Sequence, residues 1–372
     1  GCKGHGIYIK NGHANSIIVY KIENCQGDGI RIENGEENDI HADPYNTYIR
    51  NCGGNGISIL NGYGNSVNST DKTFSIQGNS GSGIYIEGGE KNKIQNLTIE
   101  NNRKHGIELS NTKGTYINHV SILQCGEDGL HIGNKSKRNI DIKNLYLAGN
   151  KNGIAIEGEG TEFNVVGSYG DKVGVGYYFD YVQNKFIFNE NTGNKQYGVY
   201  IYNGASNNRV EHVSIIASGS HGVMIEGENT VQNKIYCCQI GRSYEDEIGI
   251  KGNGGDGVHI TNKAQRNIVT ETEIDACGGN GVTVSGEGTN FNQITIKNYI
   301  GKYSPNKGFG ILISDGALGT LVRSNRLYIN EMGGICLDGV TKQWAENEER
   351  WELASVLSNY IGYDDEKDEP LE

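Results

Sequence analysis

The chain has 372 residues and a formal net charge of −12 at pH 7, and hydrophobic residues make up 35% of it. This charge disfavours nucleic acid and anionic membranes as partners, so we expect no nucleic-acid binding. No run of about 18 apolar residues occurs, so we expect no membrane span.

A repeat that starts at a glycine runs along almost the whole chain. Each glycine is followed by an aliphatic or aromatic residue, a variable residue and a second aliphatic or aromatic residue. A repeat this short cannot close its own core, so neighbouring copies must stack. The sequence predicts one solenoid over residues 1–363 and an acidic tail over 364–372, whose end we interpret as a tag remnant. The fourteen glycines are Gly6, Gly29, Gly56, Gly83, Gly106, Gly129, Gly153, Gly176, Gly198, Gly222, Gly257, Gly281, Gly310 and Gly334.

Residues 83–106 show the secondary structure that we expect of one coil. After Gly83, the alternation in 84–87 predicts a short strand with Ile84 and Ile86 on its inner face. Two glycines then mark a turn, and a second alternating stretch follows at 92–99. About three short strands per coil, without any helical period, predict an all-β, parallel β-helix of about fourteen coils.

Two further columns of residues repeat in the same register. Asparagines recur 9 to 11 residues after the glycine, where we expect left-handed turns and amides stacked between coils. Four residues before the glycine, cysteine alternates with asparagine at what we predict to be a small inward corner of buried, free thiols. The asparagines are Asn15, Asn38, Asn65, Asn92, Asn139, Asn164, Asn208, Asn233, Asn267 and Asn292, and the cysteines are Cys2, Cys25, Cys52, Cys125 and Cys277.

These repeats resemble those of the right-handed parallel β-helix superfamily, which includes pectate lyases, polygalacturonases, alginate lyases, mannuronan epimerases, phage tailspikes and surface adhesins. The resemblance implies the fold over residues 1 to about 363, and a polysaccharide as the partner. Gly4-His5-Gly6 resembles a polygalacturonase signature, but the accompanying motifs are missing. The lyases of this superfamily use calcium, so calcium is a candidate cofactor. The resemblance also implies an extracellular or cell-surface location.

In enzymes of this fold the active cleft runs over the outward face of the first strand of each coil. Outward positions lie two and four residues after each glycine, and the middle coils concentrate acidic, histidine and tyrosine residues there. We expect the catalytic residues among His131, Glu157, Tyr178, Asp180 and Tyr200, and substrate-binding residues among Tyr85, Glu108, Tyr202 and Glu226. A two-residue shift of register at 174–177 would move Tyr178 to the second column and Asp180 beyond it.

Two reaction types fit these residues, and a non-catalytic function is the alternative. Glu157 and Asp180, one coil apart, could act as paired glycosidase carboxylates. His131, with Tyr178 or Tyr200, could instead move a proton beside a uronate carboxyl group, as in a lyase or an epimerase. The alternative is a structural or carbohydrate-binding module such as an adhesin, a stalk or a tailspike. We also expect an insertion at 341–351 and a homo-oligomer formed through an open solenoid end.

Overall fold

The computed structural model describes residues 1–42, 47–70, 74–180, 183–189, 191–340, 343–345, 350–352, 354–364 and 369–370. Within these residues every regular element is a β-strand, and no helix is present that could cross a membrane. The chain divides into two compact units, Gly1–Lys195 and Gln196–Glu372. Each unit is a stack of β-helix turns, so the all-β parallel β-helix predicted from the repeat is confirmed.

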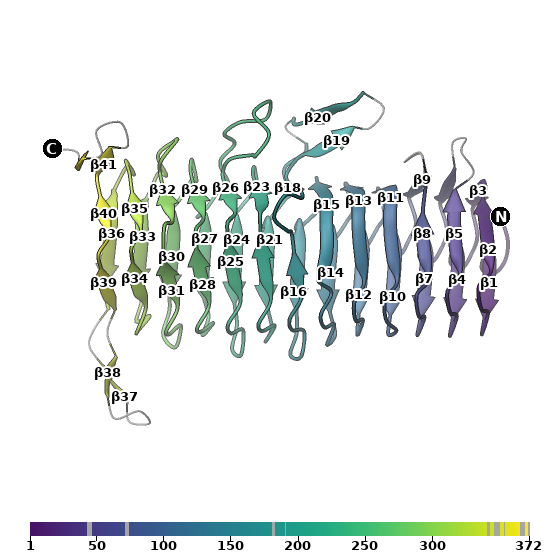
Figure 1. The fold of residues 1–372 in the computed structure, drawn as a ribbon, viewed down its shortest axis with the longest axis horizontal. Coiled ribbons are helices and arrows are strands. Elements are labelled where there is room, and N and C mark those ends of the chain that lie inside the picture. The colour runs from purple at the N-terminus through teal and green to yellow at the C-terminus, as the bar shows by residue number, and fades with distance from the viewer. Residues whose placement is uncertain are drawn as a thin grey trace. The chain divides into compact units, whose positions relative to one another are not determined.

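In the first unit, each turn contributes strands to three parallel ladders (Figure 1). The first ladder contains β1 (Ile7–Lys10), β4 (Ile30–Glu33), β7 (Ile57–Leu60), β10 (Ile84–Glu87), β12 (Ile107–Ser110), β14 (Leu130–Gly133) and β16 (Ile154–Glu157). The second ladder contains β2 (Ser16–Val19), β5 (Asp39–Ala42), β8 (Ser66–Asn68) and β17 (Val165–Val166), and the third contains β3 (Lys21–Glu23), β6 (Tyr48–Arg50), β9 (Phe74–Gln77) and β18 (Val173–Val175). Three eight-residue strands run through both of these ladders: β11 (Lys93–Glu100), β13 (Tyr116–Leu123) and β15 (Asp141–Ala148).

The second unit repeats this arrangement. Its first ladder contains β21 (Val199–Tyr202), β24 (Val223–Glu226), β27 (Val258–Thr261), β30 (Val282–Ser285), β33 (Phe309–Ser314) and β36 (Gly333–Asp338). Its second contains β22 (Arg209–Glu211), β25 (Lys234–Tyr236), β28 (Ile268–Thr270), β31 (Gln293–Thr295), β34 (Leu321–Arg323) and β39 (Ser355–Leu357). Its third contains β23 (Val213–Ile215), β26 (Gln239–Ile240), β29 (Glu273–Ile274), β32 (Tyr299–Ile300), β35 (Arg326–Leu327) and β40 (Tyr360–Ile361).

The coil expected after Gly176 adds no strand to the three ladders formed by the described residues. Instead, β19 (Tyr178–Asp180) pairs antiparallel with β20 (Lys185–Ile187), in a hairpin that Figure 1 shows beyond the end of β15. The described residues therefore form about thirteen turns, where the repeat predicted about fourteen coils. The glycine signal alone could not show this, because an insertion can carry the same local alternation as a coil.

The insertion expected at 341–351 contains a pair of antiparallel strands among its described residues. Strands β37 (Gln343–Ala345) and β38 (Arg350–Glu352) pair antiparallel, and Figure 1 shows them projecting from the region of β39. The chain then returns to the repeat, because β39 and β40 pair with the preceding turn. A last antiparallel pair joins β41 (Tyr363–Asp364) and β42 (Glu369–Pro370).

The inward aliphatic side chains of successive turns form the core. Ile84 and Ile86 are fully buried, as are Ile94 and Ile99 of the same turn, which confirms the predicted inner face. The repeat's glycine is required by packing, because a Cβ at Gly83 would lie 2.3 Å from Cγ2 of Ile99. At this position the chain passes so close to its own third strand that no side chain fits.

The asparagine column forms the stacked amide ladder that the sequence predicts. Oδ1 of Asn92 accepts hydrogen bonds from the backbone N–H (3.0 Å) and the side-chain amide (3.1 Å) of Asn65, and Nδ2 of Asn92 donates to the carbonyl of Gly62 at 3.0 Å. The left-handed backbone conformation expected for this column lies one residue earlier, as at Lys91, where φ is 58°. The amide, and not the turn, therefore explains the asparagines.

The cysteine column confirms the predicted small inward corner. Cys25, Cys52, Cys125 and Cys277 are buried, Cys2 is half-buried, and all are free thiols. The column continues through asparagines, since the N–H of Cys52 donates to Oδ1 of Asn79 at 3.0 Å. The cysteine side chains fill the space at this corner, and the asparagine side chains fill it and also accept backbone hydrogen bonds.

Replacing Asn92 by alanine should strongly destabilise the protein. The substitution removes the acceptor of two hydrogen bonds and leaves the buried backbone N–H of Asn65 unpaired, which costs about 1–3 kcal/mol, while the carbonyl of Gly62 keeps the N–H of Glu90 as a donor. Denaturant unfolding should show a loss of about 1–3 kcal/mol in the free energy of unfolding. The neighbouring exposed residue provides the control, Lys93→Ala, which should change this free energy by under about 0.5 kcal/mol. Equal effects in both variants would contradict the ladder.

Asp275 should make stability depend on pH. Its side chain is fully buried, and burial raises the pKa of this carboxyl group from 3.8 to about 6, even though the N–H groups of Tyr303 and Ser304 donate to Oδ1. Between about pH 4 and pH 6 the folded state then binds a proton that the unfolded chain has lost, so this contribution to stability falls as the pH rises.

We therefore expect the melting temperature of the wild type to rise relative to that of Asp275→Asn as the pH falls from about 7 to about 5. Scanning calorimetry across this range measures the difference. The variant Asp246→Asn, in the exposed part of the preceding loop, should follow the wild type at every pH. If the melting temperatures of Asp275→Asn and the wild type changed in parallel with pH, the raised pKa of Asp275 would be refuted.

Candidate active site

The residue just before the repeat's glycine caps the backbone of the next turn; we call these residues the pre-glycine column. In the first turns, the N–H of Asp28 donates to Nδ1 of His5 at 2.9 Å. The N–H of Asn55 then donates to Oδ1 of Asp28 at 2.8 Å, and the N–H of Ser82 donates to Oδ1 of Asn55 at 2.7 Å. Each side chain thus supplies an acceptor that the strand ladder does not provide.

The order histidine, aspartate, asparagine recurs in this column twice more. In the first unit, the N–H of Asp128 donates to Nδ1 of His105 at 3.2 Å, and the side-chain amide of Asn152 donates to Oδ1 of Asp128 at 2.7 Å. In the second unit, the N–H of Asp256 donates to Nδ1 of His221 at 2.9 Å, and the N–H of Asn280 donates to Oδ1 of Asp256 at 2.7 Å.

The second oxygen of each aspartate holds the side chain three residues later. Oδ2 of Asp128 lies 2.9 Å from Nδ1 of His131, and Oδ2 of Asp256 lies 2.9 Å from Nδ1 of His259. In the first copy an arginine takes this place, and Nη1 of Arg31 donates to Oδ2 of Asp28 at 3.2 Å. One carboxylate oxygen therefore accepts a hydrogen bond from the next turn, and the other orients an outward-facing side chain.

Asp128 is ionised and fixes the proton of His131. Burial raises the pKa of Asp128, but the hydrogen bonds and charges of His105 and His131 outweigh burial and hold this pKa below its usual value. A carboxylate can only accept, so Nδ1 of His131 carries a proton and Nε2 is left for chemistry. Burial lowers the pKa of His131, but Asp128, with the charges of Glu157 and Glu108, raises it above its ordinary value.

His131 lies between two glutamates on the outward face of the first ladder. Its Nε2 lies 3.5 Å from Oε2 of Glu157, and its Cα pairs with that of Glu108 on the adjacent strand. Glu108 also accepts a hydrogen bond from the hydroxyl of Ser82 at 2.7 Å. A cationic imidazole between carboxylates can donate a proton, and a neutral one can accept a proton.

In the second unit, the corresponding histidine faces a hydroxyl group. Nε2 of His259 lies 3.0 Å from Oγ of Ser285, and the His221 and His259 rings are 4.8 Å apart. Burial and the nearby His259 lower the pKa of His221, although Asp256 opposes them. His221 is therefore a neutral imidazole whose Nδ1 already accepts a backbone proton.

Two groups of ligand-type side chains lie close enough to hold a metal ion among the described residues: His105, Asp128, His131 and His221, Asp256, His259, with atoms within 4.8 Å of one another. In each group one Nδ1 accepts a backbone N–H and the other donates to the aspartate, so an ion bound through these Nδ1 atoms would have to replace both bonds. Calcium prefers six to eight oxygen ligands, which two imidazoles and one carboxylate do not match. The donor set therefore fits a proton network better than calcium.

The structure brings together part of the predicted site. Tyr85, Glu108 and His131 lie on consecutive strands of one ladder, and Glu157 contacts His131. The hydroxyl of Tyr85 donates to Oε2 of Glu87 at 3.0 Å, and burial with this bond raises the pKa of Tyr85 to about 12.

The expected position of Tyr178 and Asp180 is wrong, as is the alternative register. Both residues lie on the β19–β20 hairpin and not on the outward ladder beside Glu157. Oδ1 of Asp180 accepts the N–H of Gln183 at 3.0 Å. The chain leaves the ladder after Gly176, so neither residue joins His131 through strand pairing.

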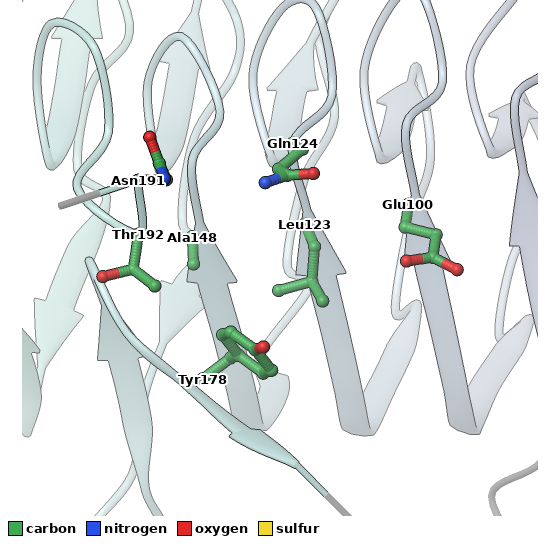
Figure 2. A pocket seen from close by; sticks show the side chains of 7 residues that line it. All are labelled: Glu100, Leu123, Gln124, Ala148, Tyr178, Asn191 and Thr192. Carbon is green, nitrogen blue, oxygen red and sulfur yellow. The ribbon is translucent and has the colours of Figure 1, made fainter. Parts of the chain in front are cut away.

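Tyr178 instead forms one side of a pocket at the ends of β11, β13 and β15. The pocket has a volume of about 130 Å³, and Figure 2 shows its lining residues: Glu100, Leu123, Gln124, Ala148, Tyr178, Asn191 and Thr192. Burial, with the charges of Asp180 and Glu100, raises the pKa of Tyr178. A neutral phenol beside aliphatic and amide groups suits binding better than proton abstraction.

Three other predicted residues form a cluster in the second unit. The rings of Tyr200 and Tyr202 are stacked, with centroids 3.9 Å apart and planes 5° apart, and the hydroxyl of Tyr200 donates to Oε1 of Glu226. Tyr197 adds a ring 4.9 Å from Tyr200 and stacks on His221 at 5.9 Å. This surface combines aromatic faces with a carboxylate.

The predicted site omitted Asp128 and Asp256, as well as the other histidines and the serine of the two networks. The sequence does carry a signal for them. A histidine before one repeat glycine is followed, one repeat later, by the pattern Asp-Gly-x-His, at 128–131 and again at 256–259. Only the pairing of turns shows that these separate motifs touch.

Comparisons with known proteins agree with the fold. Residues 5–169 match the family described as "Right handed beta helix region", and no curated protein matches the chain. The Azotobacter vinelandii mannuronan C-5 epimerase AlgE4 A-module is similar at 13% identity and a TM-score of 0.47, over 96% of this chain and 86% of that one.

Two further solved structures show how varied the similar proteins are. Tailspike protein 2 of the Escherichia coli bacteriophage CAB120 is similar at 12% identity and a TM-score of 0.38, over 96% of this chain and 44% of that one. The catalytic domain of a GH87 alpha-1,3-glucanase is similar at 14% identity and a TM-score of 0.42, over 95% and 64% of the two chains. At these identities and scores, the likenesses assign no activity to this chain.

The pKa of His131 should fall when Asp128 loses its charge. In Asp128→Asn the imidazolium loses its hydrogen-bonded carboxylate while staying buried, so we expect the pKa of His131 to decrease. Nitrogen-15 spectra of labelled histidine, recorded against pH, measure this pKa. The variant Asp141→Asn, at an exposed position of the same unit, should leave the pKa of His131 unchanged. An unchanged value in Asp128→Asn would contradict the dyad.

Proposed function

We propose that the protein acts on a polysaccharide, with His131 as the group that transfers a proton in the first unit. The observation that carries this proposal is the contact of 2.9 Å between the buried carboxylate of Asp128 and Nδ1 of His131. This contact leaves Nε2 on the outward face of the ladder, beside Glu157. A long open strand face suits an extended polymer better than a small metabolite.

The reaction type that fits best is proton transfer next to a uronate carboxyl group, as in β-elimination or epimerisation. Asp128 holds the imidazole in one tautomer, so Nε2 can accept the proton from carbon. The raised pKa of His131 favours its protonated form, so the same group can return the proton. Glu157 stabilises the imidazolium that forms between these steps.

Aromatic and acidic side chains provide binding surfaces for sugars. Tyr85 and Glu108 lie next to His131 on the first ladder. In the second unit, the stacked rings of Tyr200 and Tyr202 with the carboxylate of Glu226 offer a flat apolar face and an acceptor for sugar hydroxyls. An extracellular or cell-surface location would give the protein access to such polymers, and we include it in the proposal.

A non-catalytic polysaccharide-binding module is the second candidate, and the first copy of the network favours it. There Arg31 replaces the histidine, and Leu60 occupies the place that Glu157 has beside His131. This copy caps its neighbouring turn without a histidine at the outward position that His131 occupies in the later copy. The network is therefore compatible with a role in stability alone.

A panel of acidic and neutral polysaccharides separates these two functions. We expect turnover of a uronate-containing polymer, seen as ultraviolet absorbance of unsaturated uronates for a lyase or as changed proton spectra for an epimerase. Reducing ends would appear without unsaturation if the reaction were hydrolysis. His131→Ala should lower the rate by about 10²–10⁴-fold. Glu157→Gln should lower it less, because this residue acts through the imidazole.

The control is Arg31→Ala, which disrupts the first copy of the network but should leave the activity unchanged. Melting temperatures of all variants show whether a loss of rate is a loss of fold. Binding of a polymer without turnover would support the non-catalytic module. Full activity in His131→Ala would refute the role of this residue, and neither binding nor turnover on any polymer would refute the proposed function.

A further inference from the structure

The network of the second unit ends in a serine, and we infer that Asp256, His259 and Ser285 form a nucleophilic triad that cleaves carboxylic esters. Oδ2 of Asp256 lies 2.9 Å from Nδ1 of His259, and Nε2 of His259 lies 3.0 Å from Oγ of Ser285. Nucleophile, base and orienting carboxylate are thus within hydrogen-bonding distance in series, which is the arrangement that activates a serine hydroxyl.

The charge of Asp256 determines which nitrogen of His259 donates and which accepts in this series. Burial raises the pKa of Asp256, but the hydrogen bond of His259 and the backbone N–H of Asn280 outweigh it, so this pKa is lowered and the carboxyl group is ionised. Nδ1 of His259 must then donate, and Nε2 must accept. The hydroxyl of Ser285 is therefore the donor to Nε2, as general-base activation of this oxygen requires.

Its surroundings hold Ser285 in this orientation and leave it accessible. Its side chain is half-buried on the outward face, and the Oγ atom lies 3.3 Å from the hydroxyl of Thr261 in the preceding turn. The Ser285 hydroxyl can donate to the Thr261 hydroxyl or to Nε2 of His259, and its rotation to Nε2 starts the base-assisted step. The carboxylate is buried deeply enough that water does not compete for it.

The other two copies of the network show that the serine is specific to this one. Leu60 and Glu157 occupy the equivalent position, four residues after the repeat glycine of the following turn. Leucine has no nucleophilic atom, and Glu157 lies 3.5 Å from its histidine. The cap of the aspartate N–H by a histidine is common to all three copies and does not need a hydroxyl here, so this cap does not explain Ser285.

The reaction is acyl transfer to water. Oγ of Ser285 attacks the ester carbonyl carbon and its proton passes to Nε2 of His259. The bond to the alcohol oxygen then breaks, and His259 returns the proton to that oxygen. Water attacks the acyl-serine and gives a proton to His259, and the acid leaves as Oγ regains its hydrogen. His221, with its proton on Nε2, is a neutral donor beside the triad for the carbonyl oxygen.

This inference stands independently of the proposed polysaccharide function, since it uses only residues of the second unit and a different bond. A short acyl group, such as acetyl, is the class of substrate that we expect at an outward strand face. The test therefore uses two small probes, p-nitrophenyl acetate for turnover and a fluorophosphonate for covalent capture of the serine.

We expect the fluorophosphonate to label the intact chain once, and mass spectrometry of peptides to place the label on Ser285. Ser285→Ala should abolish labelling, and His259→Gln should slow it by about 10²–10⁴-fold. Asp256→Asn should slow it too and shift its pH dependence, because the imidazole loses its partner. Acetate release above the buffer rate should fall in parallel in these variants.

The matched control is Ser314→Ala, at the same column position one turn later, where the hydroxyl donates to Asp315 at 2.8 Å. It should keep wild-type labelling. Absence of labelling in the wild type, equal labelling in Ser285→Ala, or a label on another residue would overturn the triad. Melting temperatures within a few degrees of the wild type establish that the variants are folded. The polysaccharide assays of the His131 variants test the proposed function, and their outcome does not bear on the triad.

Discussion

Everything in this protein depends on stacking identical turns in register, so that each residue lies above its equivalent in the turn below. Strand pairing satisfies the backbone inside the three ladders, but the corners between ladders would leave buried N–H groups unpaired. Side-chain oxygens and nitrogens from the adjacent turn accept these protons, as Oδ1 of Asn92 does for Asn65. Because an unpaired buried N–H costs about 1–3 kcal/mol, each corner selects residues that can accept.

The chemistry of the candidate sites follows from the same constraint. A corner residue must accept one hydrogen bond from a backbone N–H, and His, Asp and Asn all do so in the pre-glycine column. Aspartate alone among them has a second, equivalent acceptor left over once the cap is made. Because the cap holds the carboxylate rigid and buried, that second oxygen orients an imidazole with little freedom, as at Asp256 and His259. Structural and chemical roles thus share one side chain.

The repeat allowed the ladders, the inward isoleucines and the asparagine and cysteine columns to be predicted, because strand periodicity and in-register stacking leave few alternatives. It also placed Tyr85, Glu108 and His131 on one outward face. The sequence did not reveal the hairpin at Tyr178, since the alternation there is that of a coil. It did not reveal the contact of His131 with Asp128 either, because side-chain direction at a corner depends on backbone angles that the period of two does not set.

The recurrence of the histidine, aspartate and asparagine order has a consequence for how such proteins change over evolutionary time. The network occupies three consecutive turns, and its contacts run only to the neighbouring turns. A duplication or exchange of a few whole repeats would therefore transplant a complete site, with its hydrogen bonds intact. Point substitutions at the two or three outward positions, such as those occupied by Leu60, Glu157 and Ser285, could then diversify the copies. In such a solenoid, a hydrogen-bond network that first stabilises the fold can gain a new reaction through substitution of one outward residue beside it.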